Sequence, residues 1–153
     1  MDYPELMQLI DQEWVAFIHT LGSVPITAFD QPAFDGWSLK DLVGHITTWE
    51  EDSLRAVLSW AQGQDHTPLN TDPAWTLDAF NAEQVERKRA VPLVVLLNEL
   101  GAAHARLVSL LALLPPATFT GDRLDKLTGD TWHHYKEHRG AIERWLADQD
   151  TSG

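Results

Sequence analysis

The chain has 153 residues, 44% of them apolar, and contains no cysteine. This length and composition predict a single globular domain, over residues 1–150, and exclude disulfides, thiolate metal ligands and a cysteine nucleophile. A formal net charge of −12 would repel phosphate backbones and anionic lipids, so we expect neither a nucleic-acid nor a membrane partner.

The ends and apolar runs of the chain predict a soluble, cytoplasmic protein. Residues 1–5 include two acids and no base, whereas a signal peptide begins with a basic region. The longest apolar run, at about residues 91–97, is too short to cross a bilayer.

Apolar residues recur with a helical period in the first third of the chain. The first helix is expected between a cap at Asp2 and a stop at Gly22. A turn-rich stretch follows, and Ser38 with Asp41 forms a capping box that opens the second helix. A loop without periodicity is expected at about residues 63–73.

The same period continues through the rest of the chain. Thr76 caps a third helix that runs to about Arg89, and Pro92 kinks or restarts it before Pro115 stops it. After a short irregular segment, a last helix is expected at about residues 130–148. No segment shows the two-residue period of a strand, so the prediction is an all-α four-helix bundle, and bundles commonly build metal sites between facing helices.

Three histidines on the apolar faces of these helices are the candidate metal ligands. His134 and His138 are four residues apart, so both imidazoles leave one face of the last helix, and His45 lies on the inward face of the second. Two histidines from one helix and one from another suit a metal with open positions. Spacing alone does not place His45 beside the pair, and a hydrogen-bonded core histidine is the competing interpretation. Because a ligand imidazole must be neutral, metal occupancy should fall below about pH 6.

The remaining histidines have other interpretations. His133 falls on the solvated face, and His19 and His66 have no partner at ligand spacing. His104 faces inward, either near a pocket or bonded to a core partner.

Three acidic residues of the second helix flank His45. Asp41 could orient the His45 ring, but its role in the capping box is the preferred explanation. Asp52 is close in phase to His45 and could line a pocket above the metal. Glu50 is off that face, where a salt bridge or an interface is expected.

Several motifs resemble the DinB/YfiT-like superfamily. They are W-S-L-K-D at residues 37–41, H-I-T-T-W-E at residues 45–50, the middle segment at residues 80–89, and H-Y-K-E-H at residues 134–138 followed by Ile142 and Trp145. The resemblance implies a DinB/YfiT-like four-helix bundle with zinc or nickel held by His45, His134 and His138. It also implies a homodimer, for which Trp132, on the side of the last helix opposite the core, is a candidate interface residue.

Two functions follow as hypotheses. The first is a metal-dependent enzyme acting on a small molecule, either a thiol-dependent S-transferase or isomerase or a hydrolase. With no cysteine in the chain, a low-molecular-weight thiol or water would be its nucleophile. The second is a non-catalytic bundle that sequesters a small toxic compound, suggested by the ending of the chain, which also resembles the ClbS/DfsB-like bundle proteins.

Overall fold

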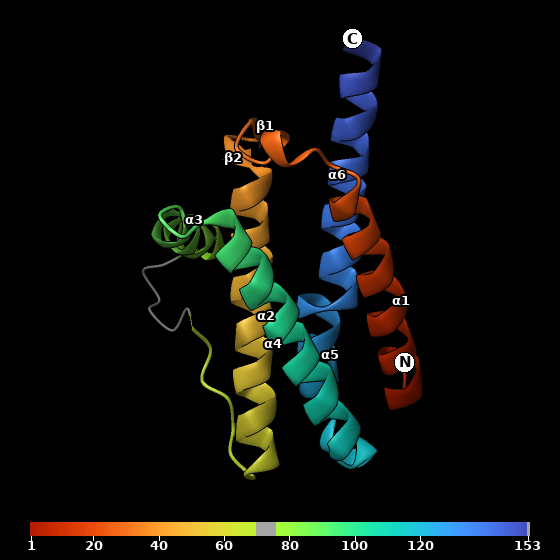
Figure 1. Cartoon of the computed structure of the whole chain (residues 1–153). Helices are drawn as coiled ribbons and strands as arrows, with labels where there is room; N and C mark the ends of the chain where they lie inside the picture. Colours follow the sequence, from red (N-terminus) through yellow and green to blue (C-terminus); the bar gives the residue numbers. More distant parts are fainter. Residues whose placement is uncertain (70–75, 153) are drawn as a thin grey trace.

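Four long helices form the bundle, and two shorter helices complete the fold (Figure 1). The computed structural model describes residues 1–69 and 76–152. Its helices are α1 (Tyr3–Gly22), α2 (Leu39–Ala61), α3 (Leu77–Lys88), α4 (Leu93–Leu113), α5 (Asp122–Asp130) and α6 (Trp132–Ser152). The all-α prediction is confirmed. The predicted loop at residues 63–73 is described only to residue 69, and the rest of it lies outside the described residues.

The helix starts follow from the predicted caps. The Asp2 carboxylate accepts a hydrogen bond from the Glu5 amide at 3.0 Å, and the Ser38 hydroxyl accepts one from the Asp41 amide at 3.1 Å. Asp41 returns a bond to the Ser38 amide, which completes the capping box at the start of α2. Thr76 caps α3 in the same way.

A short hairpin precedes α2, where only turns were expected. Strands β1 (Pro32–Phe34) and β2 (Trp37–Ser38) pair antiparallel across Asp35 and Gly36, whose φ angles are 49° and 91°. An Asp-Gly pair with positive φ at both positions is the preferred two-residue hairpin connection. Strands of two and three residues are too short to show an alternating pattern, so the sequence did not reveal them.

The segment before the last helix also differs from the prediction. Residues expected to be irregular contain a 3₁₀ turn, Pro116–Thr118, and helix α5. The backbone leaves the helical region at Thr131, with φ −115° and ψ −105°, so α6 begins at Trp132 and continues to Ser152. The nine residues of α5 bury only Leu127, which leaves a weak periodic signal.

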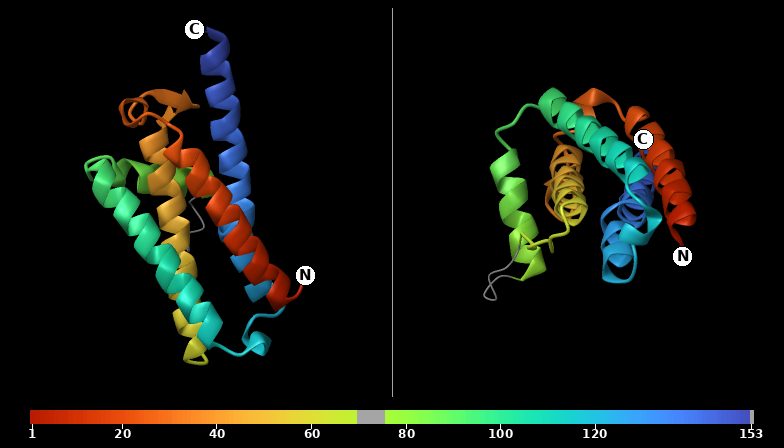
Figure 2. Two further views of the ribbon diagram at one scale, coloured as in Figure 1. Left: turned by 45° about the vertical axis from the view of Figure 1, so that its right-hand side comes forward. Right: turned by 90° about the horizontal axis from the view of Figure 1, so that it is seen from below.

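The bundle is built from two helix pairs. Helix α2 packs on α4, α1 packs on α6, and α2 also faces α6. Helix α3 lies outside the four long helices against α2, and the last turns of α6 extend beyond the other helices (Figure 2). The approach of α3 is close at Gly44, where an added Cβ would lie 3.4 Å from the Lys88 side chain.

Two apolar clusters fill the bundle, one toward each end. The first contains Phe17, Ile46, Leu100 and Ile142 among others, and the second contains Ile10, Ala56, Leu107 and Leu127 among others. Each long helix contributes to at least one cluster. Burial of these side chains is the main source of stability in a fold of this kind.

A buried polar layer lies at the level where the clusters meet. The Glu50 carboxylate of α2 is fully buried and accepts hydrogen bonds from the Tyr135 hydroxyl at 2.6 Å and from His104 Nδ1 at 2.7 Å. Trp14 of α1 stacks on the His104 ring, with centroids 3.6 Å apart. One residue from each long helix therefore takes part in this layer.

Helix α4 combines a core face with an exposed apolar face. Among the described residues it is the one helix long and apolar enough to cross a membrane by length and composition. The sequence prediction considered only the uninterrupted run at residues 91–97 and missed this. The core helices of soluble proteins pass the same criterion, and α4 supplies Leu96, Leu100 and Leu107 to the two clusters.

Replacing Tyr135 with Phe should destabilise the protein by about 1–3 kcal/mol, because the fully buried Glu50 loses its closest donor. Chemical denaturation with urea measures this change. Tyr3→Phe is the matched control, since Tyr3 is the other tyrosine of the chain and its hydroxyl donates to the neutral Leu111 carbonyl. The control should cost only about 0.5–1.5 kcal/mol. Equal costs would show that Glu50 does not depend on Tyr135.

Candidate metal centre

Three imidazoles meet between α2 and α6. His45 comes from α2, His134 and His138 come from successive turns of α6, and one nitrogen of each lies within 4.8 Å of the others. The Nε2 atoms of His45 and His134 are 3.0 Å apart. The structure thus brings together the three histidines that the sequence singled out.

Burial keeps these imidazoles neutral. Desolvation, together with smaller effects of His138 and Lys88, lowers the pKa of His45 to about 3. Desolvation also lowers the pKa of His134 well below its usual value, with His138, His45 and His133 contributing, and it lowers the pKa of His138. Each ring therefore offers a nitrogen lone pair at neutral pH, as metal ligation requires.

The donor set fits a divalent transition metal. Metal–nitrogen bonds of about 2.0–2.2 Å at octahedral to tetrahedral angles place two ligand nitrogens roughly 2.8–3.6 Å apart. The His45–His134 separation of 3.0 Å lies within this range. Imidazole nitrogen suits zinc and nickel. Within the described part of the chain, the cluster includes no carboxylate as a fourth ligand, so positions on the metal would remain for a substrate.

His134 also departs from the usual pattern of a metal-binding histidine. Its Nδ1 atom is buried and, within residues 1–69 and 76–152, has no hydrogen-bond partner. Ligand histidines commonly donate this second nitrogen to a carboxylate or carbonyl, which fixes the tautomer. In the described part of the chain, no such group fixes the tautomer of His134.

Two adjoining cavities open above the imidazoles. One, of about 420 Å³, is lined by His45, Trp49, Leu77, Asn81, Gly129, Asp130, His134, Glu137 and His138. The other, of about 450 Å³, is lined by Phe34, Asp35, Trp37, Leu42, Asp78, Asn81, His138 and Ala141. They share Asn81 and His138, so the imidazoles lie beside enough space for a small organic molecule.

The three further candidates from the sequence lie elsewhere. Asp41 caps α2 and pairs with Arg89, and its bonds run to these partners. Asp52 is fully buried and binds Lys126 at 2.7 Å and His66 at 3.1 Å, so it lines neither cavity. His104 belongs to the polar layer with Glu50 and also lines neither cavity.

Other expectations for single residues are settled by burial. His133 and His19 are exposed, as expected. The surface assignment of His66 is wrong, because its side chain is 6% exposed and bonded to Asp52. Glu50 does find a partner, His104, at 2.7 Å, but this contact lies within the core rather than on the surface. Trp132 is half-buried and packs against the second apolar cluster, so it is less exposed than we expected, and its part in an interface stays a prediction.

Asp130 is a site residue that the sequence did not reveal. Its carboxylate lines the smaller cavity, accepts from Lys126 Nζ at 2.8 Å and Ser53 Oγ at 3.0 Å, and has a pKa raised by burial despite the opposing effect of Lys126. Asn81 is a second such residue, and it accepts a hydrogen bond from Trp49 Nε1 at 2.9 Å. The Lys126–Asp130 pair is four residues apart within α5, but the bonds from Ser53 to Asp130 and from Trp49 to Asn81 join different helices, which no local pattern encodes.

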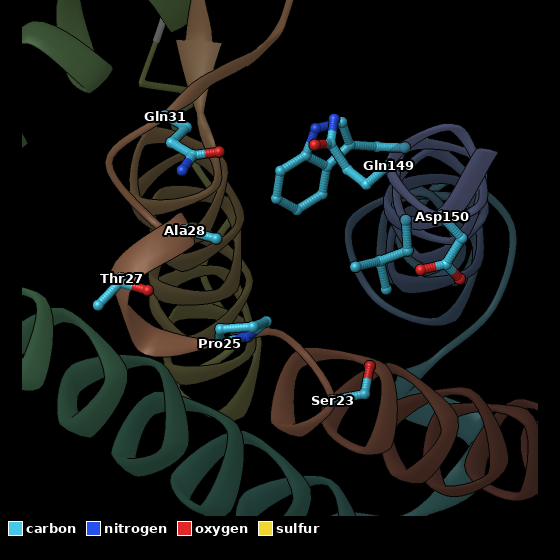
Figure 3. A pocket seen from close by; sticks show the side chains of 9 residues that line it. Ser23, Pro25, Thr27, Ala28, Gln31, Gln149 and Asp150 are labelled. Carbon is cyan, nitrogen blue, oxygen red and sulfur yellow. The ribbon is translucent and has the colours of Figure 1, made fainter. Parts of the chain in front are cut away.

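A separate cavity of about 580 Å³ lies between α6 and the segment after α1 (Figure 3). Its polar lining consists of Ser23, Thr27, Gln31, Gln149 and Asp150. These groups do not include a cluster of metal-ligating side chains. The chemistry therefore points to the histidine site.

Among the solved structures that share this fold are two proteins of about the same length. A protein from Escherichia coli UTI89, described as uncharacterised, aligns with a TM-score of 0.84 at 16% identity, covering 97% of this chain and 95% of its own. The colibactin self-resistance protein ClbS, solved in complex with a dsDNA, aligns with a TM-score of 0.78 at 18% identity, covering 95% of each chain. At such identities the similarity establishes the fold alone.

The sequence comparison identifies the family. No curated protein is similar enough in sequence to be matched to this chain. Residues 10–147 match the family model described as the mycothiol maleylpyruvate isomerase N-terminal domain, a range that includes all three histidines of the site. The chain therefore belongs to the mycothiol maleylpyruvate isomerase N-terminal domain family, within the DinB/YfiT-like superfamily of helical bundles.

Proposed function

We propose that this protein is a metal-dependent enzyme that acts on a small molecule with a low-molecular-weight thiol or water as the nucleophile. The observation that carries the proposal is the convergence of His45, His134 and His138, all neutral, beside two adjoining cavities. A divalent metal bound there would acidify a thiol or water and polarise a carbonyl group.

The chain supplies several further elements of such a reaction. The rings of Trp37 and Trp49 form apolar walls that would hold an organic substrate and exclude water. Asp130 has one carboxylate oxygen anchored by Lys126 and Ser53, which leaves its Oδ1 as a proton acceptor at the cavity wall.

The thiol-dependent reaction is favoured over hydrolysis by the family. Its description names an isomerase that works with mycothiol. Since this chain contains no cysteine, the sulfur of any such reaction must arrive as a co-substrate. A thiol S-transfer or isomerisation is thus the specific form of the proposal.

The second candidate function is sequestration without catalysis. It is favoured by the fold shared with ClbS, a colibactin self-resistance protein. The ClbS structure includes dsDNA, but the net charge of −12 in this chain opposes binding to phosphates, so we expect no nucleic-acid partner. A homodimer and a cytoplasmic location remain predictions.

Substituting the ligands tests the metal site. His134→Ala and His138→Ala should each remove most of the zinc or nickel that purifies with the protein, because two imidazoles hold a metal much more weakly than three. Elemental analysis measures the metal content. His133→Ala is the matched control, since His133 adjoins His134 but is exposed, and it should retain the metal. A wild type without metal after growth in zinc and nickel would favour sequestration.

The lowered pKa values predict how the metal-free protein responds to acid. Below about pH 6.5 the unfolded chain takes up protons on its histidines while folded His45, with its pKa of about 3, does not. The free energy of unfolding should therefore fall as the pH falls from about 6.5, by up to about 1.4 kcal/mol per pH unit for His45. For the same reason, metal should be retained to a lower pH than the value of about 6 expected for ordinary histidines.

Urea denaturation in the presence of a chelator, between pH 7 and 5, measures this dependence. The slope should become shallower in His45→Gln, which removes the group concerned. His19→Gln, an exposed substitution on α1, should keep the wild-type slope. Identical slopes in wild type and His45→Gln would contradict the prediction.

A further inference from the structure

A network of buried charges reaches the wall of the smaller cavity. The Lys126 ammonium of α5 donates to the Asp52 carboxylate of α2 at 2.7 Å and to Asp130 Oδ2 at 2.8 Å. The side chain of Asp52 is 1% exposed, that of Asp130 17% and that of Lys126 23%. Of these three residues Asp130 alone lines a cavity beside the histidines, so the network can act on a ligand only through it.

The contacts of Asp130 all use one of its two oxygens. Ser53 Oγ of α2 donates to Oδ2 at 3.0 Å, and Lys126 Nζ donates to the same atom. Within residues 1–69 and 76–152, Oδ1 accepts no hydrogen bond. Two donors from two helices restrict the carboxylate, which leaves Oδ1 as the atom available to a ligand in the cavity.

The Lys126 ammonium is itself held in place from α2. Asp52 contacts it at 2.7 Å, and the Trp49 ring, which lines the cavity, has its centroid 5.6 Å from Nζ. Asp52 also contacts Arg55 and His66 at 3.1 Å each. The position of the ammonium beside the cavity therefore follows from the packing of α5 on α2 and does not require a ligand.

Opposing effects set the charge of Asp130. Burial raises its pKa, Lys126 lowers it, and the like charge of Asp52 raises it. From α6, Tyr135 interacts electrostatically with Asp130, and Glu137 lines the same cavity beside the neutral imidazoles. A general base works best when its pKa is close to the working pH while the group is still ionised. Burial makes this carboxylate more basic, and Lys126 favours its ionised form.

We infer that Asp130 is the proton acceptor of the proposed reaction and that Lys126, held by Asp52, is its positioning residue. Asp130 Oδ1 would take the proton of the thiol or water: the S–H or O–H bond breaks, an O–H bond forms on the carboxyl group, and the electron pair stays on the nucleophile. Lys126 lines neither cavity and acts by holding Oδ2 and compensating its charge. This inference deepens the proposed function and rests on it for the nucleophile.

Carbon-13 NMR of the aspartate carboxyl groups in the metal-free protein tests the positioning role. The Asp130 resonance is the one that Asp130→Asn removes. Lys126→Met should raise the midpoint of its titration by about one pH unit or more, because a nearby opposite charge is lost. Asp52→Asn should lower the midpoint, because a nearby like charge is lost. A general loosening of the structure would move both variants in the same direction, whereas an electrostatic role moves them in opposite directions.

Two further variants complete this measurement. Lys136→Met removes the same charge at an exposed position of α6 and should leave the midpoint unchanged. Ser53→Ala removes one donor to Oδ2 without changing a charge, so it should raise the midpoint by a smaller amount, and it serves where Lys126→Met does not fold. An unchanged midpoint in Lys126→Met, or in Ser53→Ala where the former does not fold, or an equal rise in Lys136→Met would overturn the inference.

A kinetic measurement separates the inference from the proposed function. In the cobalt-loaded protein at neutral pH, 2-mercaptoethanol should give a sulfur-to-cobalt absorption band. The band should form about tenfold more slowly or worse in Asp130→Asn at equal cobalt content, because the proton acceptor is lost. Equal rates in the two proteins would overturn the inference and keep the proposed function. No band in the wild type, together with the expected NMR midpoints, would reject the proposed function and keep the role of Lys126 at Asp130.

Discussion

The fold depends on one buried carboxylate. Glu50 of α2 is fully buried and accepts hydrogen bonds from Tyr135 of α6 and His104 of α4, while Trp14 of α1 stacks on His104. A buried carboxylate without donors would be strongly destabilising, so the helices must take the rotation that satisfies it. Because Tyr135 directly follows His134, the rotation of α6 that brings its hydroxyl to Glu50 also turns His134 and His138 toward His45. The hydrogen bond between Tyr135 and Glu50 thereby positions the three histidines.

The polar groups of the interior fall into two kinds, and the difference locates the reactive site. The first kind has its hydrogen bonds made within the protein. Asp52 and Lys126 bond each other and further neighbours, and Glu50 accepts from Tyr135. These groups join helices and have little left to offer a ligand. The histidine nitrogens contact mainly one another, and Nδ1 of His134 contacts no described partner at all. Buried polar groups are normally satisfied, and each exception calls for an explanation, of which a catalytic role is one. Among the described residues Lys88 Nζ, Trp132 Nε1 and Arg139 Nε also lack a hydrogen-bond partner, but only the His134 nitrogen belongs to the cluster of candidate metal ligands. A lone cluster of neutral imidazoles next to a cavity is the clearest such case here.

Features that depend on neighbouring residues in the chain could be predicted from the sequence, and features that depend on tertiary contacts could not. The caps at Asp2 and Ser38 and the inward phase of His134 and His138 follow from chemistry within one or two turns, and the structure contains all of them. Burial of His66 requires Asp52 on another segment, so its isolated position in the sequence was misleading. Trp132 was assigned by helix phase alone, but it is the first residue of α6, where it packs against the apolar cluster that includes Leu127 of α5 and is half-buried. The hairpin and α5 are too short for any period to be visible.

The candidate ligands and the rest of the cavity wall come from different parts of the fold, so one bundle could hold different substrates. All three candidate ligands come from α2 and α6, whose relative rotation is fixed by the core. Much of the remaining cavity wall comes from outside the four long helices: Phe34, Asp35 and Trp37 from the hairpin, and Leu77, Asp78 and Asn81 from α3. Substitutions at the exposed positions of these segments, such as Asp35 and Asp78, would change the charge of the cavities without removing a core side chain. Phe34 and Trp37 are different, because they pack against the first apolar cluster. The two solved structures share the fold with this chain at only 16% and 18% identity. This agrees with the separation of the two parts, because a fold places few constraints on the residues that face a substrate. The family match covers the three candidate metal ligands, whereas the residues that line the cavities of this chain would determine its substrate.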